Sequence, residues 1–215
     1  MSRTSGSFSQ KTAPRVAQTA LRLFAKYGYA AVSMRQIARD VGVQVGALYN
    51  YTPDKQALLF NILLQHMDSL LAAWAHYPKR RDPSDQVNDF IQFHLEFHFS
   101  KADEVFVAYM ELRNLIPQNF IVIEKLRRDY ETVLQEILSA GLAAGQFEIQ
   151  DAKIATLAII GMLKEVGTWY RPDGRLGEPE IIRLYQNMAL DVLGSKYVIK
   201  KGQLDKLSGR RVVIE

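Results

Sequence analysis

The segment Ser33–Leu59, SMRQIARDVGVQVGALYNYTPDKQALL, decides the fold. It begins with a serine whose hydroxyl can accept a hydrogen bond from the free N–H groups of a following helix. Four apolar residues then recur at the spacing of one helix face: Met34, Ile37, Ala38 and Val41. Gly42 follows, and glycine supplies the left-handed conformation that commonly ends a helix. The pattern predicts a short helix and then a tight turn.

Two more helices are expected in the same segment. The first runs from about Val45 to Tyr51 and buries Val45 and Leu48. The second is longer and opens at Pro53, where the missing N–H of proline costs nothing. Helix, glycine-containing turn and helix form the helix-turn-helix pattern, which places its second helix in the major groove of DNA. Plain helix packing without DNA is the alternative that spacing alone leaves open.

Charge is unevenly distributed along the 215 residues, whose formal net charge is +4. Residues 1–60 hold eight Lys/Arg against two Asp, a net of +6, and the last twenty residues carry +4, which leaves residues 61–195 at −6. The basic charge therefore falls on the segment with the helix-turn-helix pattern, and a polyanion such as DNA is attracted there. A solvated basic face with no partner is the alternative.

The run ALRLFAKYGYAAVSMRQIARDVGVQVGALYNYTPDKQALL resembles the N-terminal domain of the TetR family of transcriptional regulators. The resemblance is dense over about residues 12–60. It implies an all-helical homodimer whose first three helices bind operator DNA, while the remaining helices form a ligand pocket and the dimer interface. One position departs from the family pattern: Thr52 stands where an aromatic residue usually packs the end of the recognition helix. We expect Tyr51 or Tyr49 to take over that packing.

Nine residues are predicted to contact DNA. Gln and Asn can read adenine edges, and an alanine methyl can touch thymine. The residues expected in the major groove are Gln44, Val45, Ala47, Tyr49, Asn50 and Tyr51. Phosphate contacts are expected from Ser33, Arg35 and Lys55, the last near a helix N-terminus that already favours anions.

The rest of the chain is predicted to be helical, which makes the fold all-α. Apolar periodicity and Pro/Gly breaks indicate helices over Pro53–Tyr77, Asp82–Ser100, Ala102–Leu115, Gln118–Leu142, Asp151–Tyr170 and Glu178–Leu193. The domain division that follows is a flexible arm (1–11), a helix-turn-helix DNA-binding domain (12–60), a helical ligand-binding and dimerisation domain (61–195) and a basic tail (196–215). The arm could reach the minor groove, but a plain flexible terminus is favoured.

Composition excludes several classes of protein. The chain has no cysteine, so disulfides, thiolate zinc sites and thiol catalysis are impossible. No apolar N-terminal run resembles a signal peptide, and no stretch is judged long enough to span a bilayer, so we expect a cytoplasmic protein without a membrane partner.

A ligand pocket is expected where aromatic and polar residues gather at helical spacing. The candidates are Phe90, Phe93, His94, Phe97, His98, Tyr109, Arg113, Trp169 and Tyr170. Ordinary core packing is the alternative for each aromatic residue. Arg113 lies in an apolar context, and a buried guanidinium would need an anionic partner, either internal or supplied by the ligand.

LRNL, RRDYE and GMLKEVGTWYRPDGRL also loosely resemble the C-terminal half of TetR regulators that respond to acyl-CoA thioesters. That resemblance implies that Arg127, Arg128, Arg171 and Arg175 hold the nucleotide and pyrophosphate, since guanidinium groups suit phosphate oxygens. A solvated face with an Arg127–Glu131 pair is the alternative.

His94 and His98 lie four residues apart, as a zinc pair requires, but the intervening glutamate is misplaced for a metalloprotease helix and no third ligand is evident. We therefore expect no metal and no cofactor.

Two apolar helices near the C-terminus are predicted to form the dimer interface, in a four-helix arrangement with those of a second copy. The residues assigned to it are Ile154, Ala158, Gly161, Met162, Ile181, Tyr185 and Met188. Burial within one chain is the alternative.

These observations predict a dimeric, ligand-responsive repressor, not an enzyme, released from operator DNA by a small molecule, possibly an acyl-CoA thioester. A different hydrophobic or aromatic effector, or an activator, remains open. A pocket hydrolase would leave the +6 N-terminal segment unexplained, and an architectural DNA-binding protein would leave the acidic, aromatic-rich domain without a role.

Overall fold

The computed structural model describes residues 6–195, which form nine α-helices, one 3-10 helix and no strand, so the predicted all-α class is confirmed for that part of the chain. The helices, in chain order, are α1 (Gly6–Tyr27), α2 (Met34–Val41), α3 (Val45–Leu48), α4 (Lys55–His76), α5 (Pro83–Phe99), α6 (Ala102–Met110), η1 (Leu112–Asn114), α7 (Pro117–Ala143), α8 (Ala152–Trp169) and α9 (Glu178–Val192). The predicted basic tail and residues 1–5 of the predicted arm lie outside the described residues. Residues 6–11 of that arm are helical backbone, because α1 already begins at Gly6.

The helix-turn-helix forms as its sequence predicts, with one shorter element. Ser33 caps α2 by accepting a hydrogen bond from the backbone N–H of Gln36. Gly42 ends α2 in the left-handed conformation, with φ 82°. The recognition helix α3 is shorter than expected and ends at Leu48, and the chain continues through a turn to Tyr51.

The start of α4 corrects the sequence prediction. The helix begins at Lys55, not at Pro53, because Asp54 adopts an extended conformation and accepts a hydrogen bond of 2.7 Å from the N–H of Ala57. A carboxylate at this position satisfies an unpaired helix N–H group and interacts well with the helix dipole.

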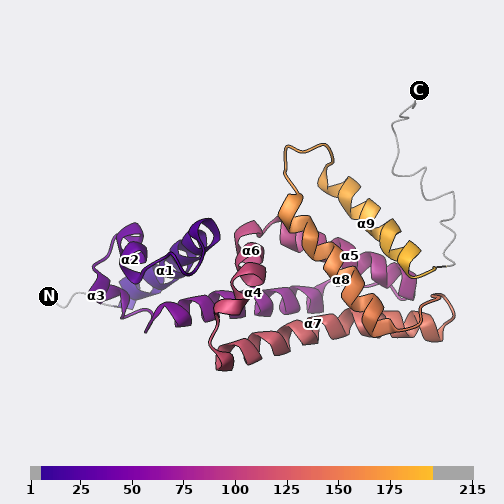
Figure 1. The fold of residues 1–215 in the computed structure, drawn as a ribbon, viewed down its shortest axis with the longest axis horizontal. Coiled ribbons are helices and arrows are strands. Elements are labelled where there is room, and N and C mark those ends of the chain that lie inside the picture. The colour runs from indigo at the N-terminus through magenta and orange to yellow at the C-terminus, as the bar shows by residue number, and fades with distance from the viewer. Residues whose placement is uncertain (1–5, 196–215) are drawn as a thin grey trace.

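By length and composition alone, α4 is apolar enough to cross a membrane, which contradicts the expectation that no such stretch exists. Its apolar residues nevertheless belong to the core: Leu58, Leu59, Leu63 and Leu70 are all buried. The helix runs from the DNA-binding domain into the C-terminal domain, and it packs against helices of both (Figure 1).

The C-terminal domain surrounds the second half of α4 (Figure 1). Helix α7 packs against α4, α5 and α8, while α9 packs on α5. The predicted helix over Ala102–Leu115 is broken: α6 ends at Met110, and η1 follows after Glu111. The other predicted helices are confirmed to within a few residues at each end.

Candidate DNA-binding surface and ligand cavity

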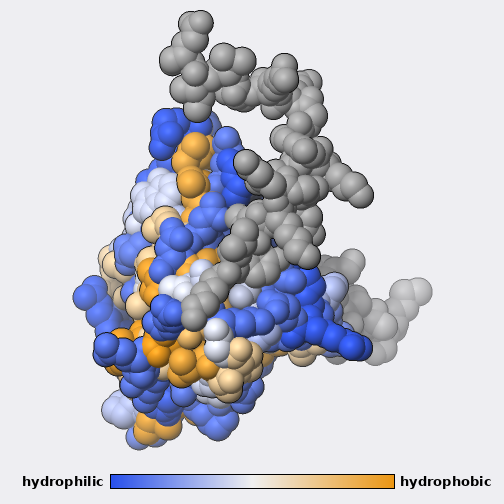
Figure 2. All heavy atoms as spheres, turned by 90° about the vertical axis from the view of Figure 1, so that its right-hand side faces the viewer, coloured by the Kyte–Doolittle hydropathy of each residue, from blue (hydrophilic) through white to orange (hydrophobic). Residues whose placement is uncertain are grey.

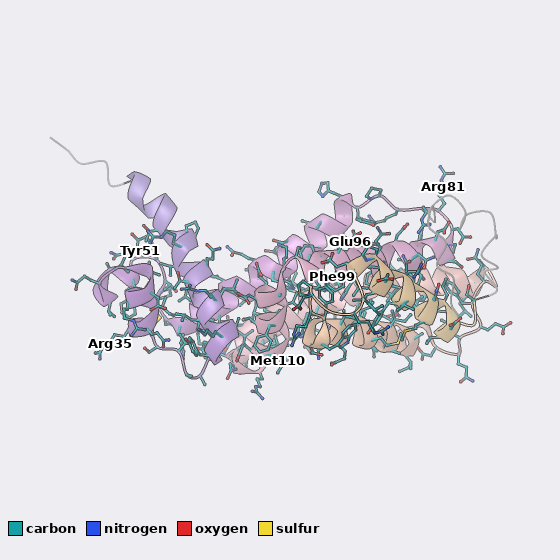
Figure 3. All side chains as sticks on the ribbon, turned by 90° about the horizontal axis from the view of Figure 1, so that it is seen from above. Arg35, Tyr51, Arg81, Glu96, Phe99 and Met110 are labelled. Atoms are coloured by element: carbon teal, nitrogen blue, oxygen red, sulfur yellow. The ribbon has the colours of Figure 1, made fainter. Side chains whose placement is uncertain are left out.

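The recognition segment, which is α3 together with the turn that follows it to Tyr51, lies at one end of the elongated molecule. Arg35 and Tyr51 lie at that end, and Arg81 lies near the opposite one (Figure 3). Gln44, Tyr49 and Asn50 are exposed, and half of the Tyr49 surface is open to solvent.

The other predicted DNA contacts differ in their exposure. Ser33 and Arg35 are exposed, whereas Val45 and Ala47 are half-buried beside α2. A shallow hollow between α2 and α3 is lined by Ser33, Arg35, Arg39 and Gln44, among others. Sequence reasoning missed Arg39, although it follows Arg35 by four residues and so shares its helix face.

The unusual Thr52 is buried, and its hydroxyl donates a hydrogen bond of 3.0 Å to the carbonyl of Asp54. Tyr51 is half-buried and packs against the hydrophobic core, while Tyr49 stays exposed. Of the two tyrosines considered, Tyr51 therefore supplies the aromatic packing at the end of the recognition segment.

Lys55 points into the protein. Its ammonium group donates hydrogen bonds of 2.8 Å to the carbonyls of Tyr29 and Val32, and it lies 4.2 Å from the centroid of the Tyr29 ring. Burial lowers its pKa. These contacts give Lys55 a structural role that the phosphate assignment overlooked: it holds the α1–α2 loop against the start of α4.

Gln56 joins the two domains. Its side-chain amide donates hydrogen bonds to the hydroxyl of Tyr29 at 2.9 Å and to the carbonyl of Asn114 at 2.5 Å, and its carbonyl accepts one from the N–H of Ile116 at 3.1 Å. Tyr29 belongs to the DNA-binding domain, whereas Asn114 and Ile116 lie between α6 and α7. Glu111 also lies close to the DNA-binding domain, because its carboxylate is 3.5 Å from the position that a Cβ would take at Gly28.

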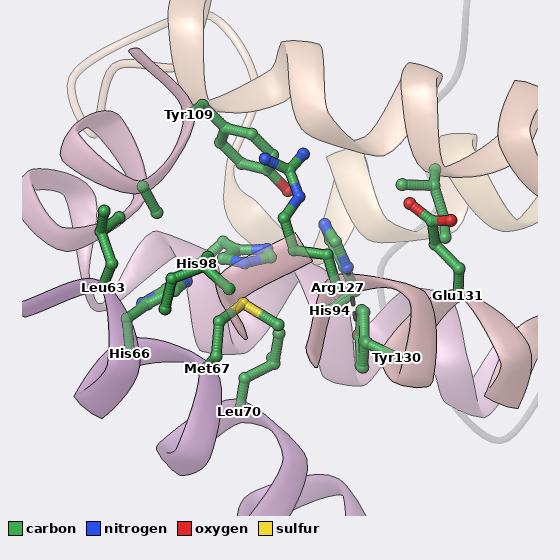
Figure 4. Close-up of a pocket in the computed structure, with 13 residues that line it drawn as sticks. Leu63, His66, Met67, Leu70, His94, His98, Tyr109, Arg127, Tyr130 and Glu131 are labelled. Atoms are coloured by element: carbon green, nitrogen blue, oxygen red, sulfur yellow. Dashed lines mark hydrogen bonds between the residues drawn. The ribbon is translucent and has the colours of Figure 1, made fainter. Parts of the chain in front are cut away.

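The C-terminal domain encloses a small cavity of about 40 Å³ between α4, α5, α6, α7 and α8 (Figure 4). The predicted ligand residues that line it are His94, His98, Tyr109 and Arg127. Its remaining lining residues, which sequence reasoning did not assign to a pocket, are Leu63, His66, Met67, Leu70, Ala108, Ile123, Tyr130, Glu131 and Ile160.

Three imidazoles meet in this cavity (Figure 4). The ring centroids of His94 and His98 lie 3.9 Å apart, and the His66 ring stacks on His98 at 5.9 Å. Burial is the main cause that lowers the pKa of His66 to about 4 and that of His94 to about 3; nearby positive charges and the other imidazoles add to it. The His98 pKa is also well below its ordinary value, again mainly through burial. All three rings are therefore neutral at pH 7.

Two ring nitrogens in this cluster have no hydrogen-bond partner within the described structure. His94 Nδ1 lies 3.1 Å from the Tyr130 hydroxyl, but His94 Nε2 and His66 Nδ1 are buried and unpaired. An unpaired buried polar atom costs free energy, so it marks a position where a ligand or water would bind. Over residues 6–195, no three or more His, Cys, Asp or Glu side chains are arranged to hold a metal ion.

Three predicted pocket aromatics belong to the core instead. Phe90 and Phe93 are buried against Trp74, and the Phe90 ring also stacks on Tyr130. Phe97 is half-buried and contacts the His66 ring edge to face. Their spacing along one helix could not distinguish core from cavity.

The other predicted ligand residues lie outside the first cavity. Arg113 is exposed in η1, because the break after α6 turns it away from the core and from Tyr109. Arg128 is exposed and pairs with Glu124 at 2.9 Å. Arg171, Arg175 and Trp169 are exposed as well.

Tyr170 lines a second cavity of about 120 Å³ between α5, α6 and α8. His98 and Tyr109 line it too, together with Lys164 and the apolar side chains Leu95 and Leu163. Sequence reasoning did not predict this cavity.

An exposed apolar stripe runs along α8 and α9. Its large side chains are between 43% and 63% exposed: Ile154, Leu157, Trp169, Leu184, Met188 and Val192. Ala158 and Gly161 are exposed beside them, and a Cβ at Gly161 would meet no atom within 4 Å. Apolar residues also surface in patches at the end of the molecule that Figure 2 shows.

Three other residues assigned to the interface are less exposed. Met162 and Tyr185 are half-buried. Ile181 is buried within its own chain, which corrects its assignment: it faces the core from the first turn of α9.

Comparison with known proteins agrees with this architecture. Residues 17–62 match the family described as bacterial regulatory proteins of the tetR family, and residues 80–193 match the tetracyclin repressor-like C-terminal domain. The second match alone spans more than half of the chain. The protein belongs to the TetR family of bacterial transcription regulators, with an N-terminal DNA-binding helix-turn-helix domain.

The individual relatives have low sequence identity to this chain, between 22% and 29%. The transcriptional repressor KstR2 of Rhodococcus jostii RHA1 is 23% identical over 197 residues, which cover 90% of this chain and 96% of the relative. A tetR-family regulatory protein from Rhodococcus RHA1 has the same fold, with a TM-score of 0.82, 29% identity and coverage of 87% and 99% of the two chains. AibR, solved with isovaleryl coenzyme A and operator DNA, has a TM-score of 0.76 at 22% identity, with coverage of 86% and 99%.

Proposed function

We propose that this regulator is a dimeric repressor, released from its operator when a small acyl-CoA thioester enters the C-terminal domain. The observation that carries the proposal is that α4 connects two parts of one chain: it follows directly on the exposed recognition segment, and it lines a cavity with unpaired polar atoms. A ligand that reshapes the cavity acts on the helix that leads to the recognition segment.

Relatives support the ligand class and the role as a repressor. AibR was solved with both isovaleryl coenzyme A and operator DNA, and KstR2 is named a transcriptional repressor. In this chain, Arg127 lines the cavity and is a group that suits phosphate or carboxylate oxygens. Arg171 and Arg175 are exposed in the α8–α9 loop, where the nucleotide of a thioester would remain in solvent contact.

The cavity of about 40 Å³ is far smaller than the ~300–1,000 Å³ of typical small-molecule sites. Ligand entry therefore requires α4, α6 or α7 to move. In this proposal that movement is the signal, and a differential affinity of ~1–3 kcal/mol between the two conformations is sufficient for regulation.

The dimer is proposed to form through the exposed stripe of α8 and α9, with two helices from each copy in a four-helix interface. A single short recognition segment buries little DNA surface. Two of them, spaced by whole turns of the DNA helix, read a palindromic operator.

Fluorescence anisotropy tests the function directly. Purified protein is titrated onto DNA from upstream of its own gene, with a scrambled duplex as control, and then challenged with a panel of acyl-CoA thioesters and the matching free acids. Selective DNA binding released by a thioester supports the proposal. Selective binding that no thioester disturbs contradicts the effector class, and no selectivity for any tested operator fragment contradicts the repressor.

A further inference from the structure

The two cavities of the C-terminal domain share two lining residues. His98 and Tyr109 line both the first cavity, of about 40 Å³, and the second, of about 120 Å³. A change of rotamer at one of these side chains would therefore connect the two spaces. Neither cavity alone approaches the size of an ordinary ligand site, but an elongated ligand that displaces the Tyr109 side chain would occupy both.

The first cavity presents a hydrogen-bond donor. Tyr130 is buried, and its hydroxyl contacts only His94 Nδ1 among the described hydrogen bonds. A phenol has a single proton to donate, and here Nδ1 is the acceptor it reaches. We assign Nδ1 as the acceptor in this contact, which places the proton of the neutral His94 ring on Nε2, a buried and unpaired atom. The missing partner of Nε2 is an acceptor, such as an oxygen atom.

That acceptor is expected to be uncharged. No described side chain forms a hydrogen bond with the Nε2 atom of His94, and the neighbouring imidazoles are neutral because burial lowers their pKa values. A carboxylate at this position would lose its hydration and would compete for Arg127, the one cation in the described lining of this cavity, whereas a carbonyl oxygen needs only the N–H donor.

Two positive charges lie instead beside Tyr109, which lines both cavities. Arg127 lies 5.2 Å and Lys164 lies 5.0 Å from the centroid of the Tyr109 ring. Neither of these cations forms an ion pair in residues 6–195. Figure 4 shows the guanidinium group of Arg127 lying against the ring of Tyr109, at the edge of the cavity.

We propose that the two cavities are halves of one site, closed by Tyr109, for an elongated ligand with two recognition groups. An uncharged carbonyl oxygen accepts from His94 Nε2–H, and an anionic group binds between Arg127 and Lys164. This proposal rests on the proposed function, because it specifies how the effector of that same domain is recognised.

Calorimetric titration of the full chain with matched probes tests the carbonyl contact. The probes are hexanoyl-CoA and its thioether analogue hexyl-CoA, which has a methylene group in place of the carbonyl. Wild-type protein should bind hexanoyl-CoA about five- to tenfold more tightly, the effect of one net hydrogen bond. The preference should disappear in His94→Phe, which keeps a ring but removes the donor. Because the main comparison changes only the probe, it does not depend on how well this buried variant folds.

The anion contact is tested with Arg127→Gln and Lys164→Gln. Each should weaken hexanoyl-CoA binding about tenfold, the scale of a charge-assisted hydrogen bond, and leave the uncharged N-acetylcysteamine thioester of hexanoate unaffected. Lys125→Gln is the matched control, because Lys125 is exposed on α7 and pairs with Asp129. It should change neither affinity.

Three results would overturn the site: equal affinity of wild-type protein for the two CoA probes, no binding of either probe, or losses in Arg127→Gln and Lys164→Gln no greater than in Lys125→Gln. Selective operator binding is measured separately, without ligand. If the protein did not bind its operator selectively, the proposed repressor would be contradicted. If operator binding were intact but the protein showed no preference for the probe with the carbonyl group, only the ligand site proposed here would be contradicted.

Discussion

Gly42 and Gly46 lie four residues apart in the helix-turn-helix, but only one of them needs to be glycine for the fold. Gly42 has φ 82°, whereas Gly46 lies inside α3 and a Cβ there would meet no atom within 4 Å. We expect Gly42→Ala to lower the free energy of unfolding by ~1–2 kcal/mol, the strain of a left-handed alanine. Gly46→Ala should raise it by up to ~1 kcal/mol, because alanine favours helix. Urea denaturation of the two variants measures both effects, and equal shifts would contradict this account.

Lys55 and Arg35 are both basic residues of the DNA-binding domain, yet their side chains have different surroundings. Lys55→Met removes two hydrogen bonds to loop carbonyls and should lower the free energy of unfolding by ~1–3 kcal/mol. Arg35→Gln changes an exposed side chain and should leave stability within ~0.5 kcal/mol. If Arg35 contacts a phosphate, its loss should lower the salt slope of DNA binding by ~1. Urea denaturation and anisotropy at several salt concentrations separate the two roles, and a destabilised Arg35→Gln would argue against them.

At the scale of the element, local signals predicted most of the fold. Ser33 and Gly42 act within one turn of themselves, so the sequence was enough to place both ends of α2. Pro53 was expected to open α4, but the helix begins at Lys55, because Asp54 has an extended backbone and caps the helix. The break after α6 had no such signal: Glu111 is buried and accepts a hydrogen bond from the Asn114 side chain, which periodicity cannot reveal.

The ligand cavity was only partly predictable, because its walls come from five helices. His94 and His98 lie one turn apart on α5, so their shared face was evident from sequence. His66 joins them from α4, and Tyr130 from α7. Neither residue stands in a distinctive local pattern, since each becomes part of the site only when the helices pack. Arg113 failed as a prediction for the converse reason: its apolar neighbours did not mean that it was buried.

The histidine cluster between α4 and α5 should make stability depend on pH. The pKa of His66 is about 4 and that of His94 about 3 in the folded protein, against 6.5 in the unfolded chain. Between pH 6.5 and 4 the unfolded chain therefore binds more protons, so stability falls as the pH is lowered through this range. Each histidine adds a slope of up to about 1.4 kcal/mol per pH unit. Urea denaturation at pH 7, 6 and 5 measures the slope, which should be about one proton smaller in His94→Phe. An unchanged slope would mean that His94 is protonated in the fold.

At the scale of the molecule, the stripe on α8 and α9 makes the dimer testable. Leu184→Glu places a charge in the proposed interface and should yield a monomer by light scattering. The apparent affinity for a palindromic operator should fall at least about 100-fold, because two linked recognition segments no longer bind together. Ile121→Glu changes an apolar and still more exposed position on α7, and it should remain dimeric. Two dimeric variants, or two monomeric ones, would exclude this face as the specific interface.

Communication between the domains depends on whether a movement around the cavity reaches the recognition segment. Gln56 is placed to transmit it, since one side chain binds Tyr29 on one side and the α6–α7 connection on the other. That connection follows directly on α6, which contributes Tyr109 to the cavity wall. Gln56→Ala should therefore keep effector affinity within about twofold while reducing the effector's influence on operator affinity about fivefold or more, a coupling loss of ~1 kcal/mol.

Gln65→Ala is the control for this coupling, because Gln65 lies on the same helix but is exposed. Operator affinity is measured by anisotropy with and without saturating hexanoyl-CoA, and effector affinity by calorimetry. If Gln56→Ala retained the full change in operator affinity, the two domains would have to communicate through the packing of α1 against α4 and α6 instead. If it lost effector binding as well, Gln56 would be supporting the cavity itself and not the link between cavity and DNA-binding domain.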